Sequence, residues 1–281
     1  MEGRASKGFN AIFAAMDKQP QAFSKWEGTG NDFILVDDHK GLFPAHDIPY
    51  VRQLCDRHYG IGSDGLILLQ KAKSDRLDFH MEFFNPDGSR SFCGNGSRCT
   101  FAFWSKLTGG SSARFTAVDG EHSAEWHEGE VAVSLAYVPY VGHDPAEPMV
   151  DFIHNGSPHE LVWVEDPATV DVRTEGAKRR WAPRRGEGGT NVNFVRWRDG
   201  RMEIRTFERG VEDETMSCGT GVVAAAISGL HRIHMPSPVH VRARGGDLRV
   251  EAELVDREGY GNIKLIGPAR EVFGGQLPPR R

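Results

Sequence analysis

The feature that most constrains this chain is a cysteine placed twice in front of a glycine–polar–glycine turn. The first copy, "FCGNGSRC", contains Cys93, and the second, "MSCGTGVV", contains Cys218. Helical patterns follow each cysteine, at 96–107 and 219–233. Glycine lets backbone N–H groups approach a ligand closely, and a helix N-terminus carries about half a positive charge. Each copy therefore predicts a site that lowers a thiol pKa and binds a carboxylate.

Further features repeat at nearly the same offset. Gly30 precedes the strand-like run "NDFILVDD" and Gly156 precedes "SPHELVWVED", 126 residues later, while the two cysteines lie 125 residues apart. Each half also has an acidic, glycine-containing turn after a phenylalanine, "FFNPDGS" and "TFERGVEDE". Several elements in one order at one offset predict a duplicated, pseudo-twofold protein.

Short alternating or apolar runs between turn residues predict a chain made mostly of strands. The predicted strands are 32–38, 65–70, 78–84, 130–138, 159–166, 191–197, 201–207 and 262–267. We predict an α/β (α+β) fold in which each half is a sheet around one helix. The predicted parts are an N-terminal tail or leader at 1–22, halves at 23–143 and 150–273 with a linker between them, and a terminal tail at 274–281.

Composition limits the class of partner. The chain of 281 residues is 39% hydrophobic and 26% charged, with a net charge of −5 that offers no basic surface for nucleic acid. No apolar run approaches the roughly 18 residues of a membrane span, and the start lacks the apolar core of a secretory signal. We therefore expect a cytoplasmic protein with a small acid–base metabolite as partner, and no nucleic acid or membrane.

The four cysteines, Cys55, Cys93, Cys99 and Cys218, are expected to be free thiols in such a compartment. No CxxC pair is present, which argues against a structural zinc site. Cys55 shares a helical stripe with Val51 and is interpreted as core, and Cys99 points away from Cys93 on its helix. "GIGSDG" at 60–65 precedes a strand instead of following one, so it is not a dinucleotide-binding fingerprint.

Two such cysteine turns, facing each other, would place a thiolate on one face of a bound amino acid and a thiol on the other. Removing the α-proton from one face and returning a proton to the opposite face inverts the stereocentre. The paired helix N-termini would hold the carboxylate as negative charge develops. No lysine is placed to suggest a pyridoxal Schiff base, and no metal is suggested, so the expected cofactor is none.

The ordered motifs resemble those of the diaminopimelate epimerase family from Phe23 to about Phe273. The motifs are "FSKWEGTGNDFILVDD", "RHYGIGSDGLILL", "FFNPDGSRSFCGNGSRC", "GSPHELV", "GTNVNFV" and "RTFERGVEDETMSCGTG". The resemblance implies two pseudo-symmetric domains, each a mixed β-sheet wrapped round a central helix, with the active site in the interdomain cleft. It also implies a cofactor-independent epimerase interconverting LL- and meso-2,6-diaminopimelate in lysine and peptidoglycan-precursor biosynthesis, and a homodimer.

The resemblance implies that Cys93 and Cys218 are the acid–base pair, donor and acceptor in one direction and exchanged in the other. His159 and Glu208 match positions near the thiols that assist their ionisation. Arg209 suits the distal carboxylate as a planar cation, and Glu208 the distal ammonium. The implied substrate-binding positions are Asn31, Asn85, Gly94, Asn95, Ser157, Asn191, Glu208, Arg209, Gly219 and Thr220.

Two positions depart from the family pattern. Ser157 stands where many members have Asn, and it hydrogen-bonds but reaches less far. Gly65 stands where some members bring a Gln side chain, so any contact there comes from backbone. Both departures affect only the expected fit of the distal end of the substrate.

Structural roles for the same residues stay open. Free cysteines are usually small buried hydrophobes, and a lone histidine such as His159 is more often structural than a base. Glu208 and Arg209 are adjacent charges, which by default form a surface pair. Asn31, Asn85 and Asn191 belong to a residue type that often only shapes turns.

Two other functions also stay open. A proline- or hydroxyproline-type epimerase or racemase would share the fold and the thiol pair, but it binds one carboxylate and has little use for Glu208 and Arg209. A hydrolase or transferase with a cysteine nucleophile would want one cysteine with a dedicated base, whereas this chain repeats the cysteine turn.

Overall fold

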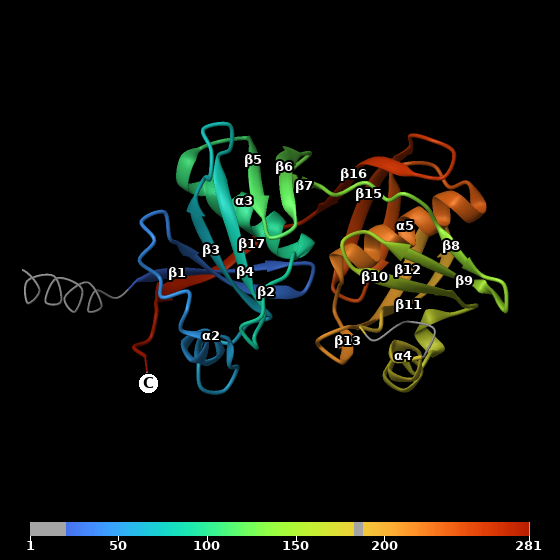
Figure 1. Cartoon of the computed structure of the whole chain (residues 1–281), viewed down its shortest axis with the longest axis horizontal. Coiled ribbons are helices and arrows are strands. Elements are labelled where there is room, and N and C mark those ends of the chain that lie inside the picture. Colours follow the sequence, from blue (N-terminus) through green and yellow to red (C-terminus); the bar gives the residue numbers. More distant parts are fainter. Residues whose placement is uncertain (1–20, 183–187, 281) are drawn as a thin grey trace, which may run out of the picture.

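The computed structural model describes residues 21–182 and 188–280, and the chain forms two halves that lie side by side (Figure 1). The elements of the first half, in chain order, are β1 (Ala22–Gly28), β2 (Asn31–Asp37), α2 (Ile48–Cys55), β3 (Gly65–Lys71), β4 (Phe79–Phe84), α3 (Gly94–Thr108), β5 (Ser112–Ala117), β6 (Gly120–His127) and β7 (Glu130–Ser134). Those that follow are β8 (Gly142–Asp144), β9 (Glu147–His154), β10 (Pro158–Trp163), the short 3-10 helix η1 (Pro167–Thr169), α4 (Val172–Arg180), β11 (Asn191–Arg198), β12 (Arg201–Glu208), β13 (Asp213–Thr215), α5 (Gly219–Ile233), β14 (Val239–Ala243), β15 (Gly246–Leu254), β16 (Tyr260–Gly267) and β17 (Arg270–Gln276).

The first half is a mixed sheet that wraps round α3. Neighbouring strands pair from β1 to β7 in chain order, parallel at β2–β3 and β4–β5 and antiparallel elsewhere. Every residue of α3 from Gly94 to Trp104 is buried, because strands surround the helix on several sides. Phe101, Phe115 and other apolar side chains form the core between helix and sheet.

The second half repeats this arrangement round α5. Pairing runs through β9, β10, β11, β12, β14, β15 and β16, parallel at β10–β11 and β12–β14. The sequence of α5, "GTGVVAAAISGLHRI", is apolar on nearly all faces, and Gly221 to Gly229 are buried. A helix that is hydrophobic all round needs contacts on all sides, which the curved sheet supplies.

The two sheets join through strands that are distant in sequence. β16 pairs antiparallel with β7, so the second sheet continues into the first. β17 then returns to the first half and pairs with β1, with Ala22 opposite Gln276 (Figure 1). The halves are therefore linked by continuous hydrogen-bonded sheet.

The structure confirms the predicted fold class and the two central helices, with α3 beginning at Gly94 and α5 spanning 219–233. The predicted strand at 130–138 ends at Ser134, and α4 was not predicted. The expected linker at 144–149 is instead the turn and start of the β8–β9 hairpin. Within the described residues, no helix has the length and apolar composition to cross a membrane.

The ends of the chain differ from the predicted tails. The expected tail at 274–281 begins inside β17, and Leu277 is buried in a cluster with Tyr50 and Val51. The Tyr50 hydroxyl donates a hydrogen bond of 2.7 Å to the Pro278 carbonyl. Of the expected leader at 1–22, residues 1–20 lie outside the described part of the chain.

We expect Leu277→Ala to lower the free energy of unfolding by about 2 kcal/mol, because it removes buried methyl groups from this cluster. Gln276→Ala, at the exposed neighbouring position, is the matched control. Urea denaturation measures both variants. Equal urea midpoints would show that the end of the chain contributes nothing to the core.

Candidate active site

The two central helices meet at their N-termini. A Cβ placed on Gly94 would lie 3.8 Å from the Gly219 Cα, and one placed on Gly219 would lie 3.2 Å from Asn95 Oδ1. Cys93 and Cys218 are the N-cap residues of these helices, both with extended backbone (φ −135° and −109°). The duplicated turns therefore occupy equivalent positions on two helices that face one another.

The Asn95 side chain ties the two turns together. Its Nδ2 donates to Asn31 Oδ1 at 2.7 Å and to the Ser217 carbonyl, next to Cys218, at 3.2 Å. Its Oδ1 accepts a bond of 2.9 Å from Arg98 Nη1. Sequence reasoning assigned Asn95 to a backbone cradle and missed this bridging role of its side chain.

Arg98 is a fully buried guanidinium behind the first turn of α3. Its other hydrogen bonds go to Thr29 Oγ1 at 2.7 Å and to the Pro268 carbonyl at 3.3 Å. Burial lowers the pKa of this guanidinium. This positive charge lowers the pKa of Cys93 and adds to the field of the helix N-terminus.

The pKa of each thiol is raised in the structure, contrary to the lowered pKa that the helix N-termini predicted, because burial outweighs the groups that stabilise a thiolate. The pKa of Cys93 is raised to about 12, because burial and the negative charge of Glu208 together outweigh the lowering effect of the Gly96 N–H, 3.3 Å from Sγ. Burial and Glu208 also raise the pKa of Cys218, while the Thr220 hydroxyl, 3.5 Å from Sγ, lowers it. Because Cys93 itself raises the pKa of Cys218, ionising one thiol disfavours ionising the other.

Glu208 acts electrostatically on both sulfurs from the end of β12. Burial raises its pKa from 4.5 to about 7, with a further contribution from Asp64, although the Thr215 hydroxyl donates to it at 2.8 Å. A carboxyl group with a pKa near 7 can exchange a proton at physiological pH.

His159 lies on β10 and is 1% exposed. Its Nε2 is 3.0 Å from Thr220 Oγ1. Burial lowers its pKa to about 3, and the positive charges of Arg209 and His154 act in the same direction. The imidazole is therefore neutral near pH 7.

Ser157, Asn191 and Arg209 form a second polar group in the same half. Asn191 Nδ2 donates to Ser157 Oγ at 2.8 Å, and its Oδ1 accepts from the Arg209 backbone N–H at 2.9 Å. The exposed Arg209 guanidinium reaches Ser157 Oγ at 3.4 Å. Gly65 begins β3 in the first half, and it cannot carry a longer side chain, because a Cβ there would lie 2.3 Å from the Phe83 ring.

Asn85 differs from the other predicted site residues. Its Nδ2 donates to Ser89 and Ser91 within the turn that leads to α3. Asn31, in contrast, bridges Asn95 and Asp64. The structure thus places Asn31 beside the cysteine turns, while a substrate contact of Asn85 stays a prediction.

Among residues 21–182 and 188–280, no group of three or more His, Cys, Asp or Glu side chains is arranged to hold a metal ion. Cys55 and Cys99 are buried free thiols, as the core interpretation expected.

Known proteins resemble this chain along most of its length. A family model described as diaminopimelate epimerase matches residues 23–138 and 152–271. A diaminopimelate epimerase from Flavobacterium psychrophilum is 40% identical over 255 residues, which cover 89% of this chain and 97% of that protein. One from Chlorobaculum tepidum is 39% identical over 264 residues, covering 89% and 98%.

Solved structures share the fold at low sequence identity. A Bacillus anthracis phenazine biosynthesis protein of the PhzF family aligns with a TM-score of 0.69 at 13% identity, covering 92% of this chain and 99% of that one. A hydroxyproline epimerase from Agrobacterium vitis, solved with bound trans-4-hydroxy-L-proline, aligns with a TM-score of 0.68 at 16% identity, covering 92% and 93%. These similarities establish the two-domain fold.

The raised pKa of Glu208 predicts a pH-dependent stability. Between its ordinary pKa of 4.5 and its folded value of about 7, the folded chain keeps a proton on Glu208 that the unfolded chain has lost. The free energy of unfolding of the wild-type chain therefore decreases as pH rises through that window. Glutamine does not titrate, so the free energy of unfolding of Glu208→Gln relative to wild type should rise from pH 5 to pH 8. Since Glu208 is partly exposed, we expect this rise to be about 1 to 2 kcal/mol. Urea denaturation at both pH values measures this gain. A difference that does not change with pH would contradict the raised pKa.

Proposed function

The chain belongs to the diaminopimelate epimerase family, and from that premise we propose that it interconverts LL- and meso-2,6-diaminopimelate with two thiols and no cofactor. The observation that carries the proposal is the apposition of Cys93 and Cys218 at the N-caps of two helices whose first residues touch. Such a pair can address both faces of one α-carbon, as inversion requires.

In the proposed reaction, one cysteine is a thiolate and the other a thiol. The thiolate takes the α-proton, so a C–H bond breaks and an S–H bond forms, and the electron pair stays on the α-carbon. The opposite thiol then gives its proton to the other face, so its S–H bond breaks and a C–H bond forms. The two sulfurs exchange protonation states, and the reverse reaction uses them in the exchanged roles.

The backbone N–H groups of the cysteine turns are proposed to bind the reacting carboxylate. Gly94 and Asn95 in one turn, and Gly219 and Thr220 in the other, begin their helices, where N–H groups lack partners within the helix. Oriented dipoles that stabilise the developing charge usually contribute more to the rate of such reactions than any other single effect. The buried charge of Arg98 supports the same role from behind.

The distal end of the substrate is proposed to lie against Arg209 and Glu208. The planar guanidinium of Arg209, with Ser157 and Asn191 beside it, suits the distal carboxylate. Glu208 suits the distal ammonium, and its electrostatic contact with both sulfurs also supports a part in their ionisation. His159 is proposed to assist the thiols from the Thr220 side.

Family membership supports further proposals about context. We propose a cytoplasmic homodimer that acts in lysine and peptidoglycan-precursor biosynthesis, with diaminopimelate as its partner and neither nucleic acid nor membrane. A proline- or hydroxyproline-type epimerase shares the fold, but a substrate with one carboxylate leaves the Ser157–Asn191–Arg209 group without a role. A single-nucleophile hydrolase leaves the second N-cap cysteine unexplained.

The proposal is tested by incubating the purified protein with LL-diaminopimelate in deuterated water, with a chelator and without pyridoxal phosphate. We expect the meso isomer to form with deuterium at the inverted α-carbon. If the protein instead exchanged the α-proton of proline or inverted proline, and did not act on diaminopimelate, the proposal would be wrong and a proline-type epimerase would be favoured.

We expect Cys93→Ser and Cys218→Ser each to lower turnover by about 10²- to 10⁴-fold, because a serine hydroxyl does not ionise near neutral pH. Circular dichroism should show a folded chain for both variants. Cys55→Ser is the control: it lies in the core, so it should lower stability and leave turnover within about twofold. Near-native turnover of either N-cap variant would contradict the two-thiol mechanism.

Arg209→Lys should raise KM for diaminopimelate about tenfold, because an ammonium replaces a planar, two-pronged donor. Arg198→Lys, at an exposed strand end, is the matched control and should leave KM unchanged. Steady-state kinetics compare the two. If both variants kept the wild-type KM, the distal carboxylate would not be bound by Arg209.

A further inference from the structure

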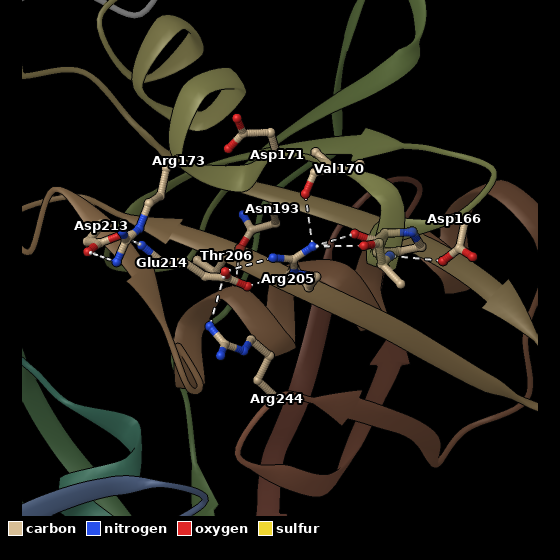
Figure 2. Close-up of polar contacts among 12 residues, drawn as sticks. Asp166, Val170, Asp171, Arg173, Asn193, Arg205, Thr206, Asp213, Glu214 and Arg244 are labelled. Atoms are coloured by element: carbon tan, nitrogen blue, oxygen red, sulfur yellow. Dashed lines mark hydrogen bonds and ion pairs between the residues drawn. The ribbon is translucent and has the colours of Figure 1, made fainter.

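Asn193 is a fully buried polar residue that sequence reasoning did not assign to the site. It lies on β11 opposite Thr206 of β12, and Figure 2 shows the two side chains next to each other. A Cβ on Gly221, in the first turn of α5, would lie 2.6 Å from Asn193 Oδ1. Asn193 therefore packs directly under the helix that begins at Cys218.

The orientation of the Asn193 amide is determined by its neighbours. One atom of the amide group lies 3.0 Å from the Glu160 backbone carbonyl, which can only accept a hydrogen bond, so that atom is the nitrogen. The Thr206 hydroxyl donates to the oxygen at 2.9 Å. The Nδ2 group has a second N–H, which is directed at His159 Nδ1 at 3.2 Å.

This donor determines the tautomer of His159. Because Asn193 presents an N–H to Nδ1, that ring nitrogen must supply a lone pair. The imidazole is neutral, since its pKa is lowered to about 3, so its single proton resides on Nε2. Nε2 therefore donates to Thr220 Oγ1, 3.0 Å away.

Thr220 connects His159 to Cys218 by hydrogen bonds. Its hydroxyl accepts from His159, so its own hydrogen is free to point at Cys218 Sγ, 3.5 Å away. The Thr220 backbone is held in turn by Asn155, whose Nδ2 donates to the Thr220 carbonyl at 2.8 Å. Each donor in this series faces toward the sulfur.

We propose that Asn193 is a positioning residue that holds His159 as the Nε2–H tautomer, so that hydrogen bonds run from Asn193 through His159 and Thr220 to Cys218 and stabilise its thiolate. The use of this thiolate in catalysis rests on the proposed function. In this arrangement His159 acts as a hydrogen-bond donor toward Cys218 and does not take its proton.

The two thiols are then stabilised in partly different ways. Cys93 Sγ accepts a hydrogen bond from the Gly96 backbone N–H, and the Gly221 backbone N–H lowers the pKa of Cys218 in the same way, but Cys218 in addition faces the Thr220 hydroxyl. Charged and titratable groups act on both ends of this chain of hydrogen bonds. Glu208 and Cys93 act on Cys218. Arg209 and His154 act on His159. Removing Thr220 Oγ1 should therefore affect one cysteine selectively.

The first test is the ¹⁵N NMR spectrum of the histidine rings in the wild-type protein, with His159 assigned by loss of its signals in His159→Gln. We expect an unprotonated Nδ1 and a protonated Nε2 at pH 7. In Asn193→Asp, a carboxylate oxygen replaces the amide donor, so the tautomer should reverse. A wild-type spectrum with the proton on Nδ1 overturns the proposal, whether or not the variant folds.

The second test measures the thiolate of Cys218 by its rate of alkylation with iodoacetamide, followed by mass spectrometry of the Cys218 peptide. Thr220→Val should lower this rate about tenfold at pH 7.5 and shift its pH midpoint up by about one unit, while Thr220→Ser stays within about twofold of wild type. The Cys93 peptide in the same digest is the internal control. Equal rates in Thr220→Val and wild type would overturn the proposal.

Neither test uses diaminopimelate, so the two proposals fail separately. The expected tautomer and alkylation pattern without deuterium exchange would refute the proposed function alone. Deuterium exchange with the opposite tautomer would refute the role of Asn193 alone.

Discussion

The rest of the structure depends on the contact between the first residues of α3 and α5. Two helix N-termini repel one another, because each carries partial positive charge and unpaired N–H groups. They are held together by the hydrogen bond from Asn95 to Ser217 and by the continuous sheet through β7 and β16. The absence of a Cβ at Gly219 allows the approach, because a Cβ there would lie 3.2 Å from Asn95 Oδ1 and 3.3 Å from the Asn95 backbone nitrogen. A carboxylate between the two helices would relieve the repulsion that the fold maintains, which makes the contact suited to binding an anion.

Duplication supplies symmetry of the backbone, while the side chains break it. Cys93 and Cys218 have the same N-cap conformation, and a backbone N–H acts on each sulfur, that of Gly96 or Gly221, yet Cys218 also faces the Thr220 hydroxyl. The buried charge of Arg98 lies on the first side only, and neutral His159 on the second. Two isomers of a substrate with two stereocentres are not mirror images, so unequal surroundings of the two bases are compatible with a reversible reaction.

Local patterns were sufficient to predict the two central helices, the cysteine turns and about half of the described strands, because each depends on residues close in sequence. The return of β17 to β1 was missed, since its pairing partner lies about 250 residues away and β17 itself is exposed and only weakly apolar. Arg98 and Asn193 were missed for a related reason. A charged residue in a helix and an asparagine in a strand suggest solvent, and only the tertiary contacts show that both are buried. Ser157 was identified, but its hydrogen bonds with Asn191 and Arg209 became evident only from the geometry.

The pKa values of the cysteines explain why a paired arrangement suits this chemistry. Burial raises the pKa of both thiols, and Glu208 opposes the ionisation of each, so a second negative charge in the same place is strongly disfavoured. One thiolate takes a proton from the substrate and the other thiol gives a proton to it. The two sulfurs and the α-carbon together therefore carry a single negative charge throughout the reaction. That charge passes from sulfur to the α-carbon and on to the other sulfur, always beside the helix N-termini. The site therefore requires no change in net charge during turnover, and fixed dipoles can stabilise every stage without reorganising.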